Sequence, residues 1–385
     1  MIVNTLFWLS LGLLLYTYLL YPVIILGISA FLKSGKAINE EAYFKSVSIL
    51  LPVHNEENNL RQKLDALLQL NYPEDLIEIL IGSDNSGDAT NDILNEYSLK
   101  YSVIKSYLFN ERRGKAAVVN SLAGMANGEI LVITDAGVIP EEQSLARMIQ
   151  AFSDPCTGLV DSNIKIISTG SKRINPERIY QVLEYRIKKA ESDAGGLLMG
   201  PSGGYYAIRR SLYRDVPANF LVDDFFINMK VLLEGYSSKI ETAALAYETE
   251  TGDRRGIFKR QVRISAGSFQ NLAYFPALLV KPWFKAFYVY ISHKVLRWLS
   301  PFIYLLFLIS NILLAGSSEI FRLLFYVQLI FIFLSAIDQV LRKINIRFTP
   351  LGIISHFIYM NIAIIVGFGK YVSGIKSGIW EPTKR

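Results

Sequence analysis

The first 32 residues contain no Asp, Glu, Lys or Arg and include the run LFWLSLGLLLYTYLLYPVIILGI. That run is longer than the roughly 20 apolar residues that a helix needs to cross a bilayer. It lacks a basic segment before it and a small-residue cleavage site after it, so we expect a retained membrane helix over 1–36 rather than a signal peptide. A chain that begins in this way must fold its polar part beside a membrane.

Three further apolar stretches, 299–318, 323–337 and 348–369, lie near the end of the chain and approach spanning length. With the first helix they predict about four transmembrane helices, in a C-terminal membrane region and tail over 299–385. Four spans would place the basic tail opposite the large polar domain, against the positive-inside rule. Either the last segment is re-entrant or its charges are tolerated there.

Basic residues flank the apolar stretches on the side of the polar domain: Lys33, Lys36, Lys45, Lys285, Lys294 and Arg297. By the positive-inside rule, the domain between the first and second spans faces the cytoplasm. These clusters also account for the net charge of +6, so the charge gives no reason to expect nucleic acid as a partner. Cys156 is the only cysteine and has no internal partner, in agreement with a reducing compartment.

The polar part alternates between strand and helix patterns. Strands are predicted at 46–53, 76–83, 101–108 and 129–136, and helices at 59–70, 88–100 and 114–126. Regular alternation predicts an α/β domain with parallel strands, in which ligands bind beyond the carboxyl ends of the strands. Those ends carry His54-Asn55-Glu56, Ser83-Asp84-Asn85 and Thr134-Asp135-Ala136.

Acids and amides at three strand ends favour a nucleotide site. The sequence has no G-x-G-x-x-G and no Walker pattern, so neither a dinucleotide fold nor a P-loop ATPase is supported. Phosphates would be neutralised by a metal ion or by Arg112, Arg113 and Lys115. Gly114 among these bases would allow close approach of the backbone to a ligand.

The segments SILLPVHNEENNL, GSDNSGDAT, RRGKAAVVNSLAG, VITDAG, GGYYAIRRSLY, VDDFFINMKVLLEGY and FKRQVRIS follow one another between residues 48 and 265. In order and spacing they resemble family 2 glycosyltransferases, the membrane-attached group related to cellulose and hyaluronan synthases. SHKVLRWLSP and the tail WEPTKR also look like members with this membrane arrangement. The resemblance implies a GT-A type, Rossmann-like mixed sheet over 37–254, followed by amphipathic interfacial helices over 255–298.

The resemblance makes Asp135 the first acid of the family's D-x-D motif, a ligand of Mg²⁺ or Mn²⁺ held with the donor phosphates. Gly137 stands where the second acid is expected, so the metal would be held by one carboxylate of this motif. The structural alternative is that Asp135 only caps a helix beginning near Glu141.

Other positions are implied to bind the nucleotide. Asp84 resembles the acid that contacts its base or ribose, within a pattern completed by Ser83, Ser86 and Asp88, although Asp88 is equally suited to cap a helix. The first loop supplies Pro52, His54, Asn55 and Glu56. Glu56 resembles a nucleotide-contacting acid, and His54 is a metal ligand or, more often for a lone loop histidine, a hydrogen-bonding residue.

The pair Asp223 and Asp224 precedes a helix and aligns with the family's acidic pair, in which Asp224 matches the proposed catalytic base and Asp223 its neighbour. Inversion at the anomeric carbon is what this implies. The alternative is that both acids only favour the helix N-terminus. Gly203 and Gly204, in GPSGGYYAIRR, would lie close to a sugar or form a tight turn, and Arg209 and Arg210 would screen phosphate or lie at the surface.

The stretch FKRQVRIS occupies the place of the family's Q-x-x-R-W signature. Arg260 and Arg263 align with its polar positions and would bind the diphosphate, whereas Ile264 replaces the tryptophan and removes a sugar-stacking face. A basic amphipathic helix on anionic lipid is the rival interpretation, and both can hold.

We therefore expect an inverting glycosyltransferase that transfers sugar from a nucleotide-diphosphate sugar, with UDP-sugars favoured, to a membrane-associated glycan or lipid-linked acceptor. Two alternatives are a processive polysaccharide synthase and a catalytically silent membrane scaffold or export partner. Gly137 and Ile264 favour the silent alternative, and the acids at 84, 135 and 224 oppose it. No heptad pattern or repeat indicates an oligomeric state.

Overall fold

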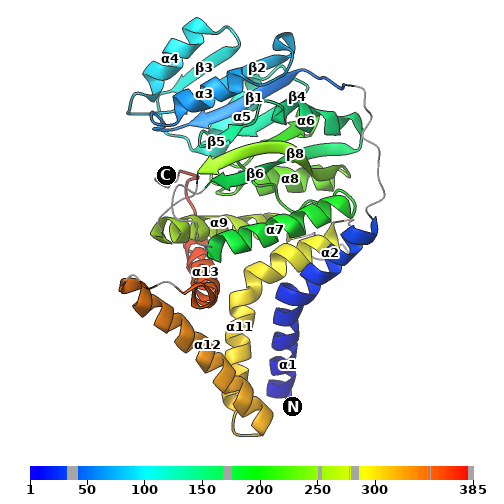
Figure 1. The fold of residues 1–385 in the computed structure, drawn as a ribbon, viewed down its shortest axis with the longest axis vertical. Coiled ribbons are helices and arrows are strands. Elements are labelled where there is room, and N and C mark those ends of the chain that lie inside the picture. The colour runs from blue at the N-terminus through cyan, green and yellow to red at the C-terminus, as the bar shows by residue number, and fades with distance from the viewer. Residues whose placement is uncertain are drawn as a thin grey trace.

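The computed structural model describes residues 1–32, 42–167, 176–249, 254–276, 278, 286–344, 346 and 348–379. Lys33, Lys36, Lys285 and the WEPTKR tail, which entered the predictions above, lie outside these residues. An eight-stranded sheet flanked by helices forms one end of the molecule, and long helices extend away from it (Figure 1).

The sheet has the order β3-β2-β1-β4-β7-β6-β8-β5. Its strands are β1 (Val47–Val53), β2 (Ile77–Asp84), β3 (Ile104–Phe109), β4 (Ile130–Thr134), β5 (Val138–Pro140), β6 (Thr157–Ile167), β7 (Tyr205–Arg209) and β8 (Ser237–Thr249). β1 to β4 are parallel, as the alternating pattern predicts. β7 then runs antiparallel to both β4 and β6, so the complete sheet is mixed.

Helices cover both faces of the sheet. α3 (Leu60–Leu68), α4 (Thr90–Lys100) and α6 (Ser144–Gln150) pack their apolar residues against one face, and α5 (Lys115–Met125) and α8 (Asp223–Leu233) against the other. Short 3₁₀ turns lie at Glu74–Leu76, Ala151–Ser153 and Arg210–Leu212. The apolar residues of α8, including Phe226 and Val231, are buried.

The direction of β7 decides where the site can form. Thr134, the last residue of β4, pairs with Tyr205, the first residue of β7. The loop 200–204 therefore enters the sheet at the edge where β4 ends. Since parallel strands end at one common edge, this loop joins the loops that follow β1, β2 and β4.

Within the described residues, four helices are long and apolar enough to cross a membrane, with mean hydropathies between 1.6 and 2.2. The first is continuous from Ile2 to Leu32 through α1 (Ile2–Leu15), a π-helical segment (Tyr16–Leu20) and α2 (Tyr21–Leu32). The second, Phe287–Leu314, combines α10 (Phe287–Val289), a π-helical segment (Tyr290–Val295) and α11 (Leu296–Leu314). It begins before the apolar stretch 299–318. Its first turns carry Lys294 and Arg297, which pair with Glu184 in the polar part of the chain.

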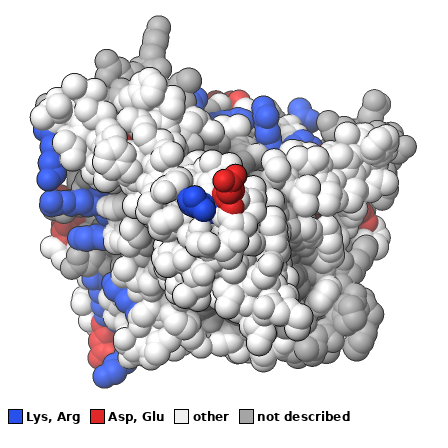
Figure 2. All heavy atoms as spheres, turned by 90° about the horizontal axis from the view of Figure 1, so that it is seen from below, with Lys and Arg blue, Asp and Glu red and all other residues white. Residues whose placement is uncertain are grey.

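α12 (Glu319–Lys343) and α13 (Thr349–Val372) are the other two. α1 packs on α11 through Phe7 and Phe307, and α12 adds Phe321 to this cluster. Viewed from below, most of the face carries no Lys, Arg, Asp or Glu, and the charged residues gather mainly along its left and upper edges (Figure 2). Such a surface suits contact with lipid.

α7 (Pro176–Asp193) and α9 (Arg254–Tyr274) lie between the sheet and the long helices (Figure 1). α13 runs beside α9: Phe258 near the start of α9 contacts Tyr359 near the middle of α13, and Phe269 contacts Phe368 and Tyr371 near the end of α13. With the hydrogen bond from Arg254 to Ser355, these contacts place α13 along α9 from Ser355 to Tyr371.

Candidate active site

The loops after β1 and β2 are interlocked. His54 Nδ1 donates to the backbone oxygen of Asp84 over 2.7 Å, and the Asn55 side-chain oxygen accepts from Gly87 N over 2.8 Å. Because a carbonyl only accepts, Nδ1 carries the proton and His54 serves as a hydrogen-bonding residue here. Glu56 Oε2 accepts from Asn59 Nδ2, which places this acid at the start of α3.

Asp84 holds the loop that precedes α5. Its two carboxylate oxygens accept the backbone N–H groups of Arg113 and Gly114 over 2.6 and 2.9 Å. Gly114 has φ +85°, a conformation that other residues rarely adopt. Asp84 is therefore a positioning residue for this loop, a role that the motif comparison did not predict.

Lys115 follows directly and connects two further acids. Its Nζ lies 2.9 Å from Asp135 Oδ1 and 3.7 Å from Asp223 Oδ2. Burial alone would lower the pKa of Lys115, but these carboxylates outweigh it and raise the pKa. Two consecutive residues, Gly114 and Lys115, thus connect acids from the ends of β2 and β4 and from the start of α8.

Asp224 lies beside the loop that leads into β7. Its Oδ1 accepts from Phe225 N, and its Oδ2 would lie 2.5 Å from a Cβ atom added at Gly203. Gly203 has φ +81°, so both the backbone and the contact require glycine. Burial raises the pKa of Asp224, the neighbouring Asp223 raises it further, and Lys115 opposes both. A carboxylate with a raised pKa suits a general base.

Gly204 also lies at this edge of the sheet. Its carbonyl oxygen accepts from Asp135 N over 2.9 Å and from the Thr134 hydroxyl over 3.1 Å. The α6 helix begins only at Ser144, with Gln143 before it, so Asp135 does not cap it and the structural alternative for this acid is wrong.

Lys63 is a site residue that the sequence reasoning missed. It is fully buried on α3, and its Nζ donates to Thr134 Oγ1 over 2.7 Å and to the Val138 carbonyl. It therefore ties together the two ends of the turn that carries Asp135. Burial lowers its pKa to about 7, with Asp135 acting in the opposite direction. The available signal was a lysine within the apolar stripe of Leu60, Leu64 and Leu67.

Asp161 on β6 was also missed. It is buried, its Oδ2 accepts from the N–H and the hydroxyl of Ser202, and its Oδ1 has no hydrogen-bond partner. Burial raises its pKa to about 7. Asp161 thus holds the loop 200–204 in place through Ser202.

A divalent cation could be held by Asp135 and Asp223, whose oxygens both face Lys115. Asp223 Oδ2 is buried without a hydrogen-bond partner, which suits an oxygen ligand for a hard cation. No group of three or more His, Cys, Asp or Glu side chains arranged for a metal occurs in the described part of the chain. The two carboxylates therefore fit a cation whose remaining ligands are phosphate and water.

The strands and loops that build this edge coincide with a known family model. Residues 48–216, from β1 to just beyond β7, match the model described as glycosyl transferase family 2. The match includes Asp84, Lys115 and Asp135 and ends shortly before the acidic pair.

Two curated proteins are similar to a larger part of the chain. "Probable glycosyltransferase YdaM" of Bacillus subtilis (strain 168) is 29% identical over 282 residues, which cover 69% of this chain and 66% of that protein. "Poly-beta-1,6-N-acetyl-D-glucosamine synthase" of Staphylococcus epidermidis is 28% identical over 239 residues, which cover 61% of this chain and 57% of that protein. The matched regions span less than two thirds of either relative.

A solved structure shows the same fold. The mannosyltransferase PcManGT from Pyrobaculum calidifontis, in complex with GDP-Man and Mn²⁺, superposes with a TM-score of 0.70 at 19% identity, covering 95% of this chain and 99% of that one. The similarity confirms the GT-A type fold and extends through the long helices.

The segment FKRQVRIS on α9 carries an arginine that lies near the acids. The Arg263 side chain points its Nη1 at the Leu221 carbonyl at 3.5 Å. Burial lowers the pKa of Arg263 and Arg260 lowers it further, whereas Asp223 and Asp135 act in the opposite direction. Arg263 is thus within electrostatic range of the site, on a helix that also packs against α13.

Two arginines that could have screened phosphate lie elsewhere. Arg209 donates to the backbone oxygens of Phe152, Asp154 and Thr157, and Arg210 donates to the Ala126 oxygen. Because β7 is antiparallel, Arg209 pairs with Ile130 at the start of β4, at the opposite edge of the sheet. The phosphate interpretation of these two residues is wrong.

The chain after α13 returns to the site. A Cβ atom added at Gly114 would lie 3.1 Å from Gly378 C, and one added at Gly378 would lie 2.5 Å from the Ala218 oxygen. Asn219 Nδ2 also donates to the Ile375 oxygen over 3.2 Å. Residues 374–379 thus pass between the loop held by Asp84 and the loop before Asp223. A cavity of about 510 Å³ lies beside them, lined by α9, α13 and Leu221.

Proposed function

We propose that this protein is a membrane-bound inverting glycosyltransferase that transfers sugar from a nucleotide-diphosphate donor, with UDP-sugars favoured, to a membrane-associated glycan or lipid-linked acceptor. The observation that carries the proposal is the connection of Asp84, Asp135 and Asp223 through the consecutive residues Gly114 and Lys115. Acids that are far apart in the sequence meet at the edge where GT-A domains bind nucleotide sugars.

Different residues would bind the nucleoside and the diphosphate of the donor. Asp84, with Pro52, His54, Asn55 and Glu56 in the adjoining loop, would hold the nucleoside. Lys115, Arg113, Arg260 and Arg263 would balance the charge that develops on the departing diphosphate, because ammonium and guanidinium groups bind phosphate oxygens strongly. A Mg²⁺ or Mn²⁺ ion held by Asp135 and Asp223 would add positive charge at the same phosphates.

Asp224 would act as the base. Its carboxylate accepts the proton of the acceptor hydroxyl while the oxygen attacks the anomeric carbon from the face opposite the leaving diphosphate. The configuration at that carbon inverts, and the nucleoside diphosphate leaves with the bonding electron pair. The backbone of Gly203 lies directly against this carboxylate, so an acceptor there would pass close to the loop, whereas Gly204 packs against Val138 and Ile164.

The membrane arrangement follows from the ends of α13. Since α13 lies along α9 from Ser355 to Tyr371 and residues 374–379 contact the catalytic domain, we infer that α13 lies at the membrane interface on the side of that domain. The tail then shares the side of the basic clusters, which by the positive-inside rule is cytoplasmic. With α13 at the interface, three spans and a cytoplasmic tail would satisfy the positive-inside rule together.

A second candidate is a processive polysaccharide synthase, because staphylococcal poly-beta-1,6-N-acetyl-D-glucosamine synthases are among the relatives. The replacement of the signature tryptophan by Ile264 favours limited addition. Products separate the two: one or a few added sugars, or a ladder of polymers.

The proposal is tested by incubating the purified full chain and native lipid extract with a panel of UDP-, GDP- and dTDP-sugars and Mg²⁺ or Mn²⁺. Release of nucleoside diphosphate, with product mass spectrometry, identifies donor and acceptor. A protein that binds and turns over no donor in native membranes is the silent scaffold instead.

A further inference from the structure

The helix that carries the acidic pair begins without a side-chain cap of its own. The N-cap residue of α8 is Val222, whose side chain has no acceptor for the first backbone N–H groups of the helix. Asp223 and Asp224 follow it directly. The position of both acids therefore depends on what holds the chain that enters α8.

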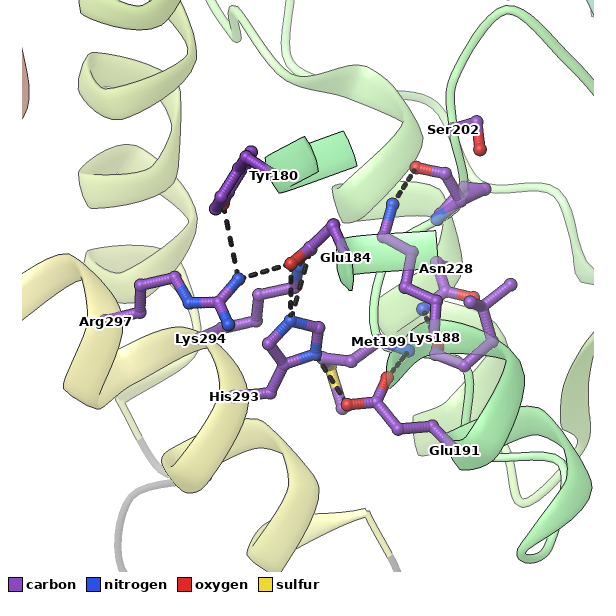
Figure 3. A network of polar contacts seen from close by, with 12 residues as sticks. Tyr180, Glu184, Lys188, Glu191, Met199, Ser202, Asn228, His293, Lys294 and Arg297 are labelled. Atoms are coloured by element: carbon purple, nitrogen blue, oxygen red, sulfur yellow. Dashed lines mark hydrogen bonds and ion pairs between the residues drawn. The ribbon is translucent and has the colours of Figure 1, made fainter. Parts of the chain in front are cut away.

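The acids lie between two loops, and the loop that leads into β7 is held from α7 (Figure 3). Lys188 on α7 donates to the Pro201 carbonyl over 3.3 Å. The charge of Lys188 also acts on the carboxylates of Asp161 and Asp224. The second loop, 219–222, is held from a different helix, α9.

Gln270 on α9 clamps the backbone of this second loop. Its Oε1 accepts from Leu221 N over 3.1 Å, and its Nε2 donates to the Asn219 carbonyl over 2.9 Å. The Gln270 side chain is buried, and so is Leu221. A buried N–H group that loses its acceptor is costly, so without this amide the loop would shift toward another partner. Gln270 thus fixes the chain two residues before Asp223.

Asn271, the next residue of α9, holds the last residue of the loop. Its Nδ2 donates to the Val222 carbonyl over 3.2 Å and to the Gly267 carbonyl over 3.0 Å, and its side chain is fully buried. The backbones also meet here, because a Cβ atom added at Gly267 would lie 3.0 Å from Val222 N. α9 is therefore in direct contact with the residue that precedes the acids.

Another face of α9 packs on α13. A Cβ atom added at Gly367 of α13 would lie 2.8 Å from the Val262 oxygen and 3.0 Å from Ala266 N. These are backbone atoms of α9, which cannot move without moving the helix. α9 is thus in backbone contact with α13 on one face and with the loop before Asp223 on another.

We propose that Gln270 and Asn271 are positioning residues for the catalytic base, and that α9 transmits the position of α13 to Asp224. The inference rests on the proposed function and deepens it, since it adds residues that act on the reaction through Asp224. A chain in which α13 is displaced from α9 would keep its acids but lose the geometry that transfer requires. Transfer would in this way depend on α13 being seated at the membrane interface.

The test compares variants of the purified full chain in detergent, with the donor and acceptor that the panel identifies. Gln270→Met keeps the length of the side chain but removes both bonds to the loop, and Asn271→Leu removes the bond to Val222. Because a misplacement of about 1 Å can lower the rate about 100-fold, we expect each variant to lower the single-turnover transfer rate at least about tenfold. The affinity for the released nucleoside diphosphate with Mn²⁺ should stay within about twofold of wild type, since only the transition state loses an interaction.

Asn311→Leu is the matched control for Asn271→Leu. Asn311 is equally buried but lies near the end of α11, and its replacement should leave the transfer rate unchanged. Amides that only stabilise the fold would lower the thermal unfolding temperature and leave the rate intact. The wild-type rate in both α9 variants, or an equal loss of rate in Asn311→Leu, therefore overturns the proposal.

Two glycines of α13 test the coupling while every side chain of α9 is retained. Gly367→Ala forces α13 and α9 apart, whereas a Cβ atom added at Gly369 would meet no atom within 4 Å. Gly367→Ala should lower the transfer rate about three- to tenfold relative to Gly369→Ala, with nucleotide affinity retained. Equal rates overturn the coupling through α9, and this pair decides the matter where an α9 variant does not fold.

The wild type separates this inference from the proposed function. A wild type that binds and turns over no donor removes the proposed function itself. An active wild type whose rate survives the α9 and α13 substitutions removes only the positioning role.

Discussion

Gly203→Ala tests the placement of the catalytic base most sharply among single substitutions. A Cβ atom at this position would lie 2.5 Å from Asp224 Oδ2, so the carboxylate or the loop must move by at least about 0.5 Å. The left-handed backbone at φ +81° adds a cost of roughly 1–2 kcal/mol. Because a misplacement of about 1 Å can reduce catalysis about 100-fold, we expect kcat to fall about 10- to 100-fold.

Gly235→Ala is the matched control. Gly235 has φ +86°, and an added Cβ atom would meet no atom within 4 Å. The two variants should therefore lose similar stability, measured as thermal unfolding in detergent, whereas only Gly203→Ala should lose kcat in a nucleotide-release assay. Equal kcat values for the two folded variants would refute the assignment of Asp224.

Three further predictions follow from the same geometry. The raised pKa of Asp224 implies that kcat declines on the acid side at a higher pH than an ordinary carboxyl group would cause; a kcat that stays flat down to pH of about 4 would contradict this. Lys63 has a folded-state pKa of about 7, below its unfolded value, so the unfolded state binds more protons between these values and stability rises with pH. The unfolding free energy of the wild type should therefore increase relative to Lys63→Met between pH 7 and 10, and a constant difference would argue against the lowered pKa of Lys63. Finally, Ser377→Cys in oriented vesicles should react with an impermeant maleimide from the same side as the exposed Cys156; labelling from opposite sides would refute the position of the tail.

The part of the fold that the sequence predicts is the part encoded by local periodicity. Apolar runs and amphipathic stripes place β1 to β4 and α3 to α5 within a few residues, because parallel βα units repeat one local pattern. The antiparallel insertion of β7 between β4 and β6 has no such signature. It decides that Gly203 lies beside Asp224 and that Arg209 lies at the far edge.

The site was predictable to the extent that its residues stand in recognisable motifs. Asp84, Asp135 and Asp223 do meet, as the strand ends and the family resemblance suggested. The contacts that connect them depend on backbone N–H groups at Arg113 and Gly114, which no motif specifies. The return of residues 374–379 depends on the packing of α13, which sequence periodicity alone cannot place.

The surroundings of Gly137 and Ile264, the two departures from the family pattern, are well ordered by other residues. The turn that lacks a second acid at Gly137 is braced by the buried ammonium of Lys63, through Thr134 and the Val138 carbonyl. The signature helix that lacks tryptophan at Ile264 still keeps Arg263 near the acids. These features favour a working site over a degraded one.

The central claim is that converging acids bind a nucleotide sugar and that one of them removes the acceptor proton. The most direct measurement compares donor affinity and single-turnover transfer rate for wild type and Asp224→Asn, with the donor and acceptor found in the panel. The account predicts donor affinity within a few-fold of wild type and a transfer rate lowered about 100-fold or more. Transfer by Asp224→Asn at the wild-type rate would contradict it.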